Sequence, residues 1–354
     1  MKSDTTVFVG LSGGVDSSVA ALRLINQGYR VVGVFIKVWQ PDWLECNWEQ
    51  ERLDAMRVAA HLEIPFLTCN AEEAYKREVA DYFIAEYKAG RTPNPDVMCN
   101  QAVKFGAFIQ FAKQYGADFV ATGHYAQMSK AENKSSLLRG VDKNKDQSYF
   151  LWTLTQEQLS NILLPVGDSP KAQIRQEATA AGIPVATKKD SQGVCFLGHI
   201  DIPEFLSHYI DLAPGRVLDE TGAEIGSHAG SVVYTIGQRH GFALANSDIH
   251  TTPHYVIARN VAENTITVST TPPIVSANST LTLDKLHWIS DAVPSTASLT
   301  AQFRYRQTPF AVDLSETSAD SFCLSLKSDV EQPAAGQSCV LYDGDVCLGG
   351  GIIA

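Results

Sequence analysis

The chain has 354 residues, of which 45% are hydrophobic and 19% charged, and its formal net charge is −11. This length exceeds what one hydrophobic core usually supports, so about two or three domains are expected. Residues 1–6 hold no apolar stretch of signal-peptide length, and no apolar run approaches the roughly 18 residues of a membrane helix. These features predict a cytoplasmic protein that does not enter a membrane. The acidic total argues only mildly against a nucleic-acid partner, because a net charge conceals local basic patches.

The first third of the chain alternates short β-rich runs with helical patterns. The expected strands are residues 6–9, 31–36, 65–68 and 119–122, and the expected helices lie near 17–27, 50–62, 72–88 and 100–115, followed by 156–164 and 170–181. This alternation predicts an α/β fold, a doubly wound domain with a parallel sheet whose ligand lies at the carboxyl ends of the strands. We place this domain at residues 1–205.

A small-residue turn, Gly-Leu-Ser-Gly-Gly-Val-Asp-Ser at residues 10–17, follows the first expected strand and opens a helix. Backbone N–H groups at a helix N-terminus bind phosphate, and glycines let the chain approach it closely. Asp16 can hold a metal ion that bridges phosphate oxygens. The turn lacks the Gly-Lys-Ser/Thr ending of a P-loop and does not fit Gly-x-Gly-x-x-Gly. It resembles the SGGxDS loop of ATP pyrophosphatases, which cleave ATP to AMP and pyrophosphate. The alternative is an ordinary glycine-rich turn.

Two of the seven cysteines have sequence settings that suit a reactive thiol. The seven, at positions 46, 69, 99, 195, 323, 339 and 347, form no Cys-x-x-Cys pair and no zinc-ligand spacing, so most are expected to be buried thiols. Cys99 follows a stiff loop with Pro93 and Pro95 and precedes a helical run, whose dipole would stabilise a thiolate. Cys195 lies in a glycine-flanked loop near lysines. For Cys99 the alternative is a buried structural cysteine.

A basic patch is predicted over residues 171–189, which carry Lys171, Arg175, Lys188 and Lys189 against the single acid Glu177. Such a patch can bind the phosphate backbone of a nucleic acid. It can equally be a solvated helix face followed by a basic loop. The sequence leaves both interpretations open.

From about residue 213 the chain changes character. Short β-rich stretches alternate with turn signals such as Pro214-Gly215, helical patterns largely disappear, and Pro272-Pro273 suggests a boundary. We therefore predict two small β domains, at residues 206–274 and 275–354, of which the last is barrel-like.

Several motifs together resemble the bacterial tRNA-specific 2-thiouridylases over nearly the whole chain. Beside the loop at 10–17 they comprise residues 90–96 with Cys99 and Asn100, then 121–125, 145–151, 191–198, 234–239, 304–307, 342–344 and 349–351, with a looser match at 333–338. The loop alone would indicate only the ATP pyrophosphatase superfamily. Cys99 and Cys195 each lie in a sequence motif of the thiouridylases, and they restrict the resemblance to that family. The chain departs from the family pattern at Ile36, where methionine is common, and at residues 40–48 and 241–244.

The resemblance implies transfer of sulfur to C2 of the wobble uridine in the tRNAs for Lys, Glu and Gln. The C2 carbonyl is a poor electrophile, and adenylation by ATP turns its oxygen into a good leaving group. A persulfide can bring sulfur from a donor protein, either a cysteine desulfurase or a relay protein, and a second thiol must then cleave the S–S bond. By the resemblance, Cys195 carries the persulfide and Cys99 ends in a disulfide with it. From the residues alone these roles can be exchanged.

The resemblance also implies binding roles for single residues. ATP, with Mg²⁺, would be held by Gly10, Leu11, Ser12, Gly13, Gly14, Val15, Asp16, Ser17, Ile36 and Gly123. The target base would contact Asn94, Pro95 and Asp96, and the rest of the tRNA would contact His124, Lys145, Asp146, Gln147, Arg304, Tyr305 and Gln337. Without the surrounding motifs, Asp146 would be interpreted as a turn residue and Arg304 as an exposed strand residue.

Two other functions fit part of the pattern. One is another adenylating ligase of the ATP pyrophosphatase superfamily, which needs no pair of reactive cysteines. The other is a non-catalytic tRNA-binding module that uses ATP only as a structural ligand, and such a module would not release pyrophosphate when tRNA is added.

Overall fold

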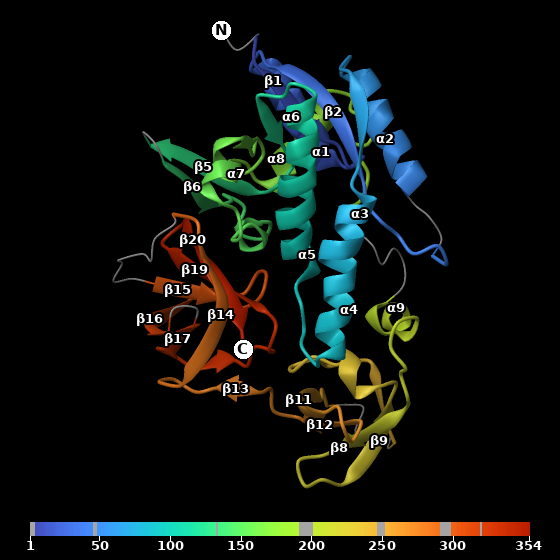
Figure 1. The fold of residues 1–354 in the computed structure, drawn as a ribbon, viewed down its shortest axis with the longest axis vertical. Coiled ribbons are helices and arrows are strands. Elements are labelled where there is room, and N and C mark those ends of the chain that lie inside the picture. Colours follow the sequence, from blue (N-terminus) through green and yellow to red (C-terminus); the bar gives the residue numbers. More distant parts are fainter. Residues whose placement is uncertain are drawn as a thin grey trace.

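The computed structural model describes residues 4–44, 48–131, 134–190, 201–245, 252–290, 299–318 and 321–354. Figure 1 shows a helix-flanked sheet at the N-terminal end, a small β unit drawn in yellow and light orange, and a barrel drawn in orange and red beside the long helices. The predicted fold class, an α/β domain followed by two small β domains, is confirmed.

A parallel sheet with the strand order β3-β2-β1-β4-β7 forms the centre of the N-terminal domain. Its strands are β1 (Thr6–Gly10), β2 (Arg30–Lys37), β3 (Phe66–Asn70), β4 (Phe119–Ala121) and β7 (Ile162–Leu163). The chain runs outward from β1 to β3 and then returns to place β4 on the other side of β1. The strand order therefore reverses between β1 and β4, and ligands of such sheets bind at the carboxyl ends of the strands at this point.

Both faces of this sheet are buried, as the alternation of side chains along β1 requires. Val7 and Val9 pack in one core with residues of α1 (Val15–Asn26), α2 (Trp48–His61) and α8 (Lys171–Ala180). Phe8 points the other way, into a core with α3 (Glu72–Tyr75), η1 (Lys76–Ala80) and α4 (Asp81–Lys88). These helices therefore pack against β1 from its two faces.

One continuous helix spans residues 95–114 and begins earlier than the predicted start near 100. It consists of α5 (Pro95–Met98), the π-helical η2 (Cys99–Ala107) and α6 (Phe108–Gln114). The start is set by Asn94, whose Oδ1 accepts the N–H of Val97 at 3.3 Å, and by the proline at the first helical position.

Two features of the N-terminal domain differ from the sequence prediction. The helix expected over 156–164 ends early: α7 (Gln156–Ser160) has a capping box from Thr155, and the next residues form the edge strand β7. A hairpin of β5 (Ala126–Ala131) and β6 (Lys134–Arg139), which was not predicted, follows β4. A short 3₁₀ helix, η3 (Ser148–Phe150), follows the hairpin.

The central β unit is a mixed sheet with the strand order β10-β9-β8-β12-β11. Its strands are β8 (Gly215–Leu218), β9 (Glu224–His228), β10 (Phe242–Leu244), β11 (Tyr255–Asn260) and β12 (Thr265–Ser269), and only the β8–β12 pair is parallel. Helix α9 (Ile202–Ser207) precedes the sheet and η4 (Ser231–Val233) interrupts it.

The last unit is a closed six-stranded antiparallel barrel, because β14 at one end of the strand order also pairs with β20. Its strands are β14 (Thr280–Trp288), β17 (Ser321–Leu326), β16 (Phe310–Ser318), β15 (Leu299–Gln302), β19 (Ser338–Asp343) and β20 (Val346–Ile353). The short strands β13 (Ile274–Val275) and β18 (Val330–Glu331) pair beside it. The barrel-like prediction is confirmed, and β13 straddles the predicted boundary.

The barrel is joined to the N-terminal domain by backbone pairing, since β20 also pairs with β6 of the hairpin. In the described ranges, no helix is both long and apolar enough to cross a bilayer.

Candidate functional site

The turn after β1 needs glycine at position 13. Gly13 has a φ of +69°, and a Cβ added there would lie 2.6 Å from the carbonyl oxygen of Glu51 on α2. The hydroxyls of Ser17 and Ser18 donate to the Gly14 carbonyl at 3.2 and 2.7 Å and close the first turn of α1. The N-terminus of α1 therefore lies directly beyond β1, as the phosphate-binding interpretation requires.

The backbone after β4 lies against the first turn of α1 at Gly123. A Cβ at this position would be 2.6 Å from the Ser17 nitrogen and 2.8 Å from the Asp16 carbonyl carbon. A Cβ on Gly10 would touch Ile36 at 3.5 Å. The structure thus brings together the residues predicted to hold ATP, Gly10, Leu11, Ser12, Gly13, Gly14, Val15, Asp16, Ser17, Ile36 and Gly123, at the strand-order reversal.

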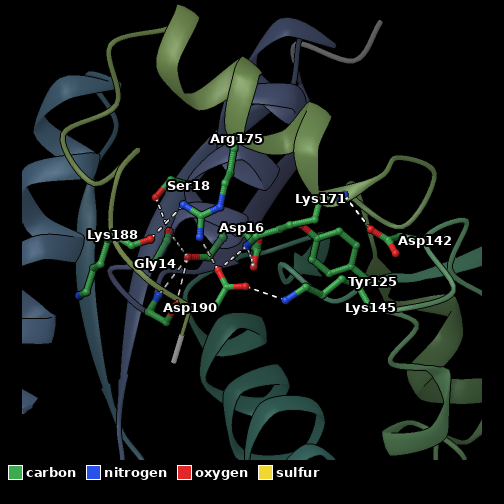
Figure 2. A network of polar contacts seen from close by, with 12 residues as sticks. Gly14, Asp16, Ser18, Tyr125, Asp142, Lys145, Lys171, Arg175, Lys188 and Asp190 are labelled. Atoms are coloured by element: carbon green, nitrogen blue, oxygen red, sulfur yellow. Dashed lines mark hydrogen bonds and ion pairs between the residues drawn. The ribbon is translucent and has the colours of Figure 1, made fainter. Parts of the chain in front are cut away.

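Asp16 is the acceptor of a polar network at the start of α1 (Figure 2). The Tyr125 hydroxyl donates to it at 2.6 Å, and the Lys171 ammonium lies 2.6 and 2.8 Å from its two oxygens. Burial, together with the bond to Asp16, raises the pKa of Tyr125 far above its ordinary value, so this hydroxyl stays a donor. Lys171 also reaches Asp190 at 2.8 Å.

Asp190 gathers three cations, since Lys145 and Arg175 each lie 2.7 Å from it in addition to Lys171 (Figure 2). Burial acts to raise the pKa of Asp190, but the bonds to Lys145 and Lys171 outweigh it and hold this pKa well below its ordinary value. Nearby, Lys188 bonds Asp54 at 2.8 Å and the Gly13 carbonyl at 3.1 Å.

The predicted basic patch therefore lies around the turn at 10–14. Its members Lys171, Arg175 and Lys188 are engaged by acids or carbonyls of the turn region, and the Lys171 side chain is only 11% exposed. The solvated-face alternative does not describe Lys171, and Lys189 is the exposed member of the patch.

Cys99 lies further into its helix than predicted. It is buried, at 2% exposure, where α5 passes into η2 and five residues after the capping Asn94. The dipole effect expected for a helix N-terminus is weaker at this depth, because it falls off within the first turn. Next to it, the Asn100 amide donates to the Phe150 carbonyl at 3.2 Å. Cys195 and residues 191–198 lie outside the described residues, as does Cys46.

Two titratable side chains near this helix are biased toward their neutral forms. Asp96 stands in the first turn of α5, and burial raises its pKa although Lys104 opposes the shift. His124 is buried after β4 and bonded through Nδ1 to the Thr122 hydroxyl at 2.7 Å. Burial, assisted by the charge of Lys104, lowers the pKa of His124 well below 6.5.

The loop that carries Asn94 and Pro95 is held by both β domains. The Thr92 N–H donates to the Ala335 carbonyl of the barrel domain at 2.8 Å, and its hydroxyl lies 3.1 Å from that of Thr235 in the central unit. Arg259 of the central unit bonds the Gly90 carbonyl and, at 2.6 Å, the Tyr234 carbonyl. The position of this loop thus depends on residues of both β domains.

Six of the seven residues predicted to contact tRNA form two groups, after the β5–β6 hairpin and on the barrel, while His124 lies after β4. In the first, Lys145 pairs with Asp190, Gln147 accepts the Tyr125 N–H at 2.9 Å, and Asp146 is buried. The Asp146 carboxylate accepts the N–H groups of Gly140 and Ser148 and pairs with Arg139.

On the barrel, Arg304 and Tyr305 line a cavity of about 550 Å³. Arg304 pairs with Glu331 at 2.8 Å, and the Tyr305 ring packs on Phe150 at 4.7 Å between centroids. The buried Oε1 of Gln337 finds no hydrogen-bond partner among the described residues. Since Phe150 also accepts from Asn100, this cavity is connected to the helix of Cys99 through direct contacts.

The chain matches known families over almost its whole length. The family models that match are described as a tRNA methyl transferase HUP domain at residues 5–199, a tRNA methyl transferase PRC-barrel domain at 203–270 and an aminomethyltransferase beta-barrel domain at 278–353. Proteins named tRNA-specific 2-thiouridylase MnmA, from Listeria monocytogenes serotype 4a and Oceanobacillus iheyensis, are each 43% identical over 99% of this chain and 95% of their own length.

The chain belongs to the tRNA-specific 2-thiouridylase family. Among solved structures, the U34-tRNA thiolase NcsA from Methanococcus maripaludis is similar at 14% identity over 59% of this chain and 65% of that one, with a TM-score of 0.36. This low similarity supports no argument about function. The domain descriptions mention methyl transfer, whereas the full-length relatives are named thiouridylases.

Sequence reasoning missed several residues that surround the predicted site. Tyr125, Asp190 and Asp54 hold the network around the turn, and Lys104 acts on both Asp96 and His124. Tyr125 was recognisable from its place directly after Gly123-His124 at the carboxyl end of β4. Asp54 and Lys104 carried no local signal, because each lies inside a helix and meets its partners only in the fold.

Proposed function

We propose that the chain transfers sulfur to C2 of the wobble uridine, position 34, in the tRNAs for Lys, Glu and Gln, and forms 2-thiouridine, AMP and pyrophosphate in the cytoplasm. The family supports tRNA as the substrate. The observation that carries the proposal is the placement of the turn at 10–17 on the strand-order reversal beside the helix that holds Asp96 and Cys99. A Cβ on Gly10 would touch Phe108 of that helix at 3.5 Å, the same distance as to Ile36.

In the proposed first step, the uridine O2 attacks the α-phosphorus of ATP. The O2–P bond forms as the bond to pyrophosphate breaks, and the uridine becomes an O2-adenylate. Gly13, Gly14 and the first N–H groups of α1 would bind the phosphates. A Mg²⁺ ion fits here, because the Asp16 and Asp190 carboxylates converge on one lysine and supply the oxygen ligands that Mg²⁺ prefers. Bound Mg²⁺ would neutralise charge on the pyrophosphate.

In the second step, a sulfur nucleophile attacks C2 and AMP leaves with the former O2. We assign the persulfide to Cys195 and the thiol that cleaves its S–S bond to Cys99, so that a disulfide between them remains and a reductant must restore both thiols. The sulfur donor is a cysteine desulfurase or a relay protein. Asn94, Pro95 and Asp96 would contact the extruded base. Burial raises the pKa of Asp96, so its carboxyl group can stay protonated and offer that proton to the edge of the base.

Contacts to the rest of the tRNA are assigned to His124, Lys145, Asp146, Gln147, Arg304, Tyr305 and Gln337. We propose a catalytic domain at residues 1–205 and tRNA-binding domains at 206–274 and 275–354. The cavity is lined by the half-buried rings of Tyr305 and Phe310 and by two arginines, Arg304 and Arg306, and these groups suit unstacked bases and phosphates. Asp146 would act by shaping its loop, since its carboxylate is bonded within the fold.

The test combines purified protein, ATP, Mg²⁺, a persulfide donor and unmodified tRNA, followed by mass analysis of the wobble nucleoside. We expect the mass gain of an oxygen-to-sulfur exchange, together with AMP formation that requires tRNA. The mass gain of a methyl group would instead support the wording of the domain descriptions. Cys99→Ser and Cys195→Ser should abolish sulfur transfer. If both variants retain full ATP-cleaving activity on a non-tRNA acceptor, the chain is another adenylating ligase.

A further inference from the structure

Within the basic patch at residues 171–189, Lys171 makes contacts that neither the RNA-binding nor the solvated-face interpretation explains. Lys171 projects from the first residue of α8 between two carboxylates, those of Asp16 and Asp190 (Figure 2). The backbone N–H of Lys171 donates to Asp142 at 3.0 Å, which holds the start of α8 at this place. Its ammonium is therefore positioned at the first turn of α1, where the proposed phosphates would lie.

The residues around Lys171 make a set of paired charges. Arg175, one turn further along α8, bonds Asp190 at 2.7 Å and the Lys188 carbonyl at 3.1 Å, while Lys145 bonds Asp190 from the opposite side. Three cations thus share Asp190, and one of them also occupies Asp16. A largely buried ammonium requires such partners, because desolvating it alone is costly.

A magnesium–polyphosphate complex contains both a cation and anionic oxygens, so it can exchange ionic partners with these paired carboxylates and cations. Its metal can take the carboxylates of Asp16 and Asp190, and its phosphate oxygens can take the cations that those carboxylates release. Each partner keeps an opposite charge throughout the exchange, so entry of the complex leaves no buried charge alone. An RNA phosphate without a metal would instead draw Lys171 away and leave Asp16 without its ammonium partner, although Asp190 would keep Lys145 and Arg175.

We propose that Lys171 is the leaving-group residue of this site, moving from Asp16 and Asp190 onto the pyrophosphate oxygens of ATP, with Arg175 holding Asp190 in place. The inference rests on the proposed function. As the bond between the α-phosphorus and the pyrophosphate oxygen breaks, its electron pair moves onto that oxygen, and the Lys171 ammonium stabilises the growing negative charge. No proton transfer is required, because magnesium pyrophosphate leaves as an anion.

The test compares Lys171→Gln with Lys143→Gln, which removes an equal charge from an exposed position in the neighbouring loop. Binding of magnesium pyrophosphate is measured by calorimetry without tRNA, and AMP formation is measured with tRNA. For Lys171→Gln we expect affinity for pyrophosphate to fall about tenfold or more and kcat for AMP formation about 100-fold or more, with a smaller change in the KM for tRNA. Lys143→Gln should behave as the wild type in both assays.

Lys171→Arg keeps the positive charge and serves as the control for a general loss of folding. It should retain the wild-type unfolding temperature and most of the pyrophosphate affinity, with an intermediate kcat. The proposal is overturned if Lys171→Gln binds pyrophosphate as tightly as the wild type, or if it matches the wild-type kcat. If the wild type binds magnesium pyrophosphate and loses this binding in Lys171→Gln, yet never thiolates tRNA, the proposed function fails while the phosphate role of Lys171 stands.

Discussion

Burial at the site favours the neutral forms of Asp96 and His124, and for Asp96 the shift has a consequence for stability. The pKa of Asp96 is raised above 3.8 in the folded chain by burial, against the opposing charge of Lys104. The fold therefore binds the protonated carboxyl more favourably than the ionised one. Its contribution to stability is fully present below pH 3.8 and is lost as the pH rises through the raised pKa.

Asp96→Asn should therefore be more stable than the wild type at neutral pH, since the amide stays uncharged. Denaturant unfolding measured at a series of pH values should show a difference in the free energy of unfolding that is small near pH 3.8 and grows in favour of the variant as the pH rises. Sulfur transfer should be lost if Asp96 releases its proton to the base, because an amide can donate a hydrogen bond but cannot give up a proton. A variant less stable than the wild type at neutral pH would contradict the assigned shift.

Gly123→Ala should damage the fold and the nucleotide site together. The added Cβ meets the backbone of Ser17 and Asp16 at 2.6 and 2.8 Å, and neither atom belongs to a flexible side chain. Separating β4 from α1 should cost about 1–3 kcal/mol of unfolding free energy. Calorimetry should also show weaker ATP binding. Unchanged stability would mean that the two backbones do not lie in contact.

At the scale of elements, the helix over 95–114 depends on its cap. Asn94→Ala removes the acceptor for the Val97 N–H and should lower the free energy of unfolding by about 1 kcal/mol. Asn94→Ser keeps a capping oxygen and should restore most of this stability. If Asn94 also contacts the target base, both variants lose thiolation while only the alanine variant loses stability. Equal stability of the two variants would show that the cap is not formed in solution.

The sequence predicted those elements whose signals are local. The parallel strands β1 to β4 are apolar runs followed by turns, and the turn at 10–17 was interpretable from its residues alone. The edge strand β7 has two residues, too few for a period to show. The β5–β6 hairpin is stabilised partly by β20, far along the chain. Lys171 and Asp16 are 155 residues apart, so their pairing could be found only in three dimensions.

At the scale of the whole molecule, the three parts are joined by direct contacts at the loop of Thr92 and at β6. Thr92 bonds the barrel domain and the central unit, and β6 extends the barrel sheet through β20. Arg139 of β6 reaches Gln302 of the barrel at 2.9 Å and packs over the Tyr342 ring. We therefore expect the N-terminal domain and the barrel to unfold together in one calorimetric transition, whereas independent domains would give separate ones.

Asp146 tests this coupling and its own predicted contact with tRNA. Its side chain is 9% exposed and pairs with Arg139 at 3.0 Å while accepting the N–H groups of Gly140 and Ser148. Asp146→Ala leaves a nearly buried guanidinium without its carboxylate, so the free energy of unfolding should fall by about 3 kcal/mol.

Asp345→Ala, in the exposed turn before β20, is the matched control and should change the free energy of unfolding little. Because Arg139 joins both parts, the single transition should move as a whole to lower temperature. If instead tRNA affinity falls with no loss of stability, the Asp146 carboxylate contacts the RNA directly and its internal bonds are dispensable.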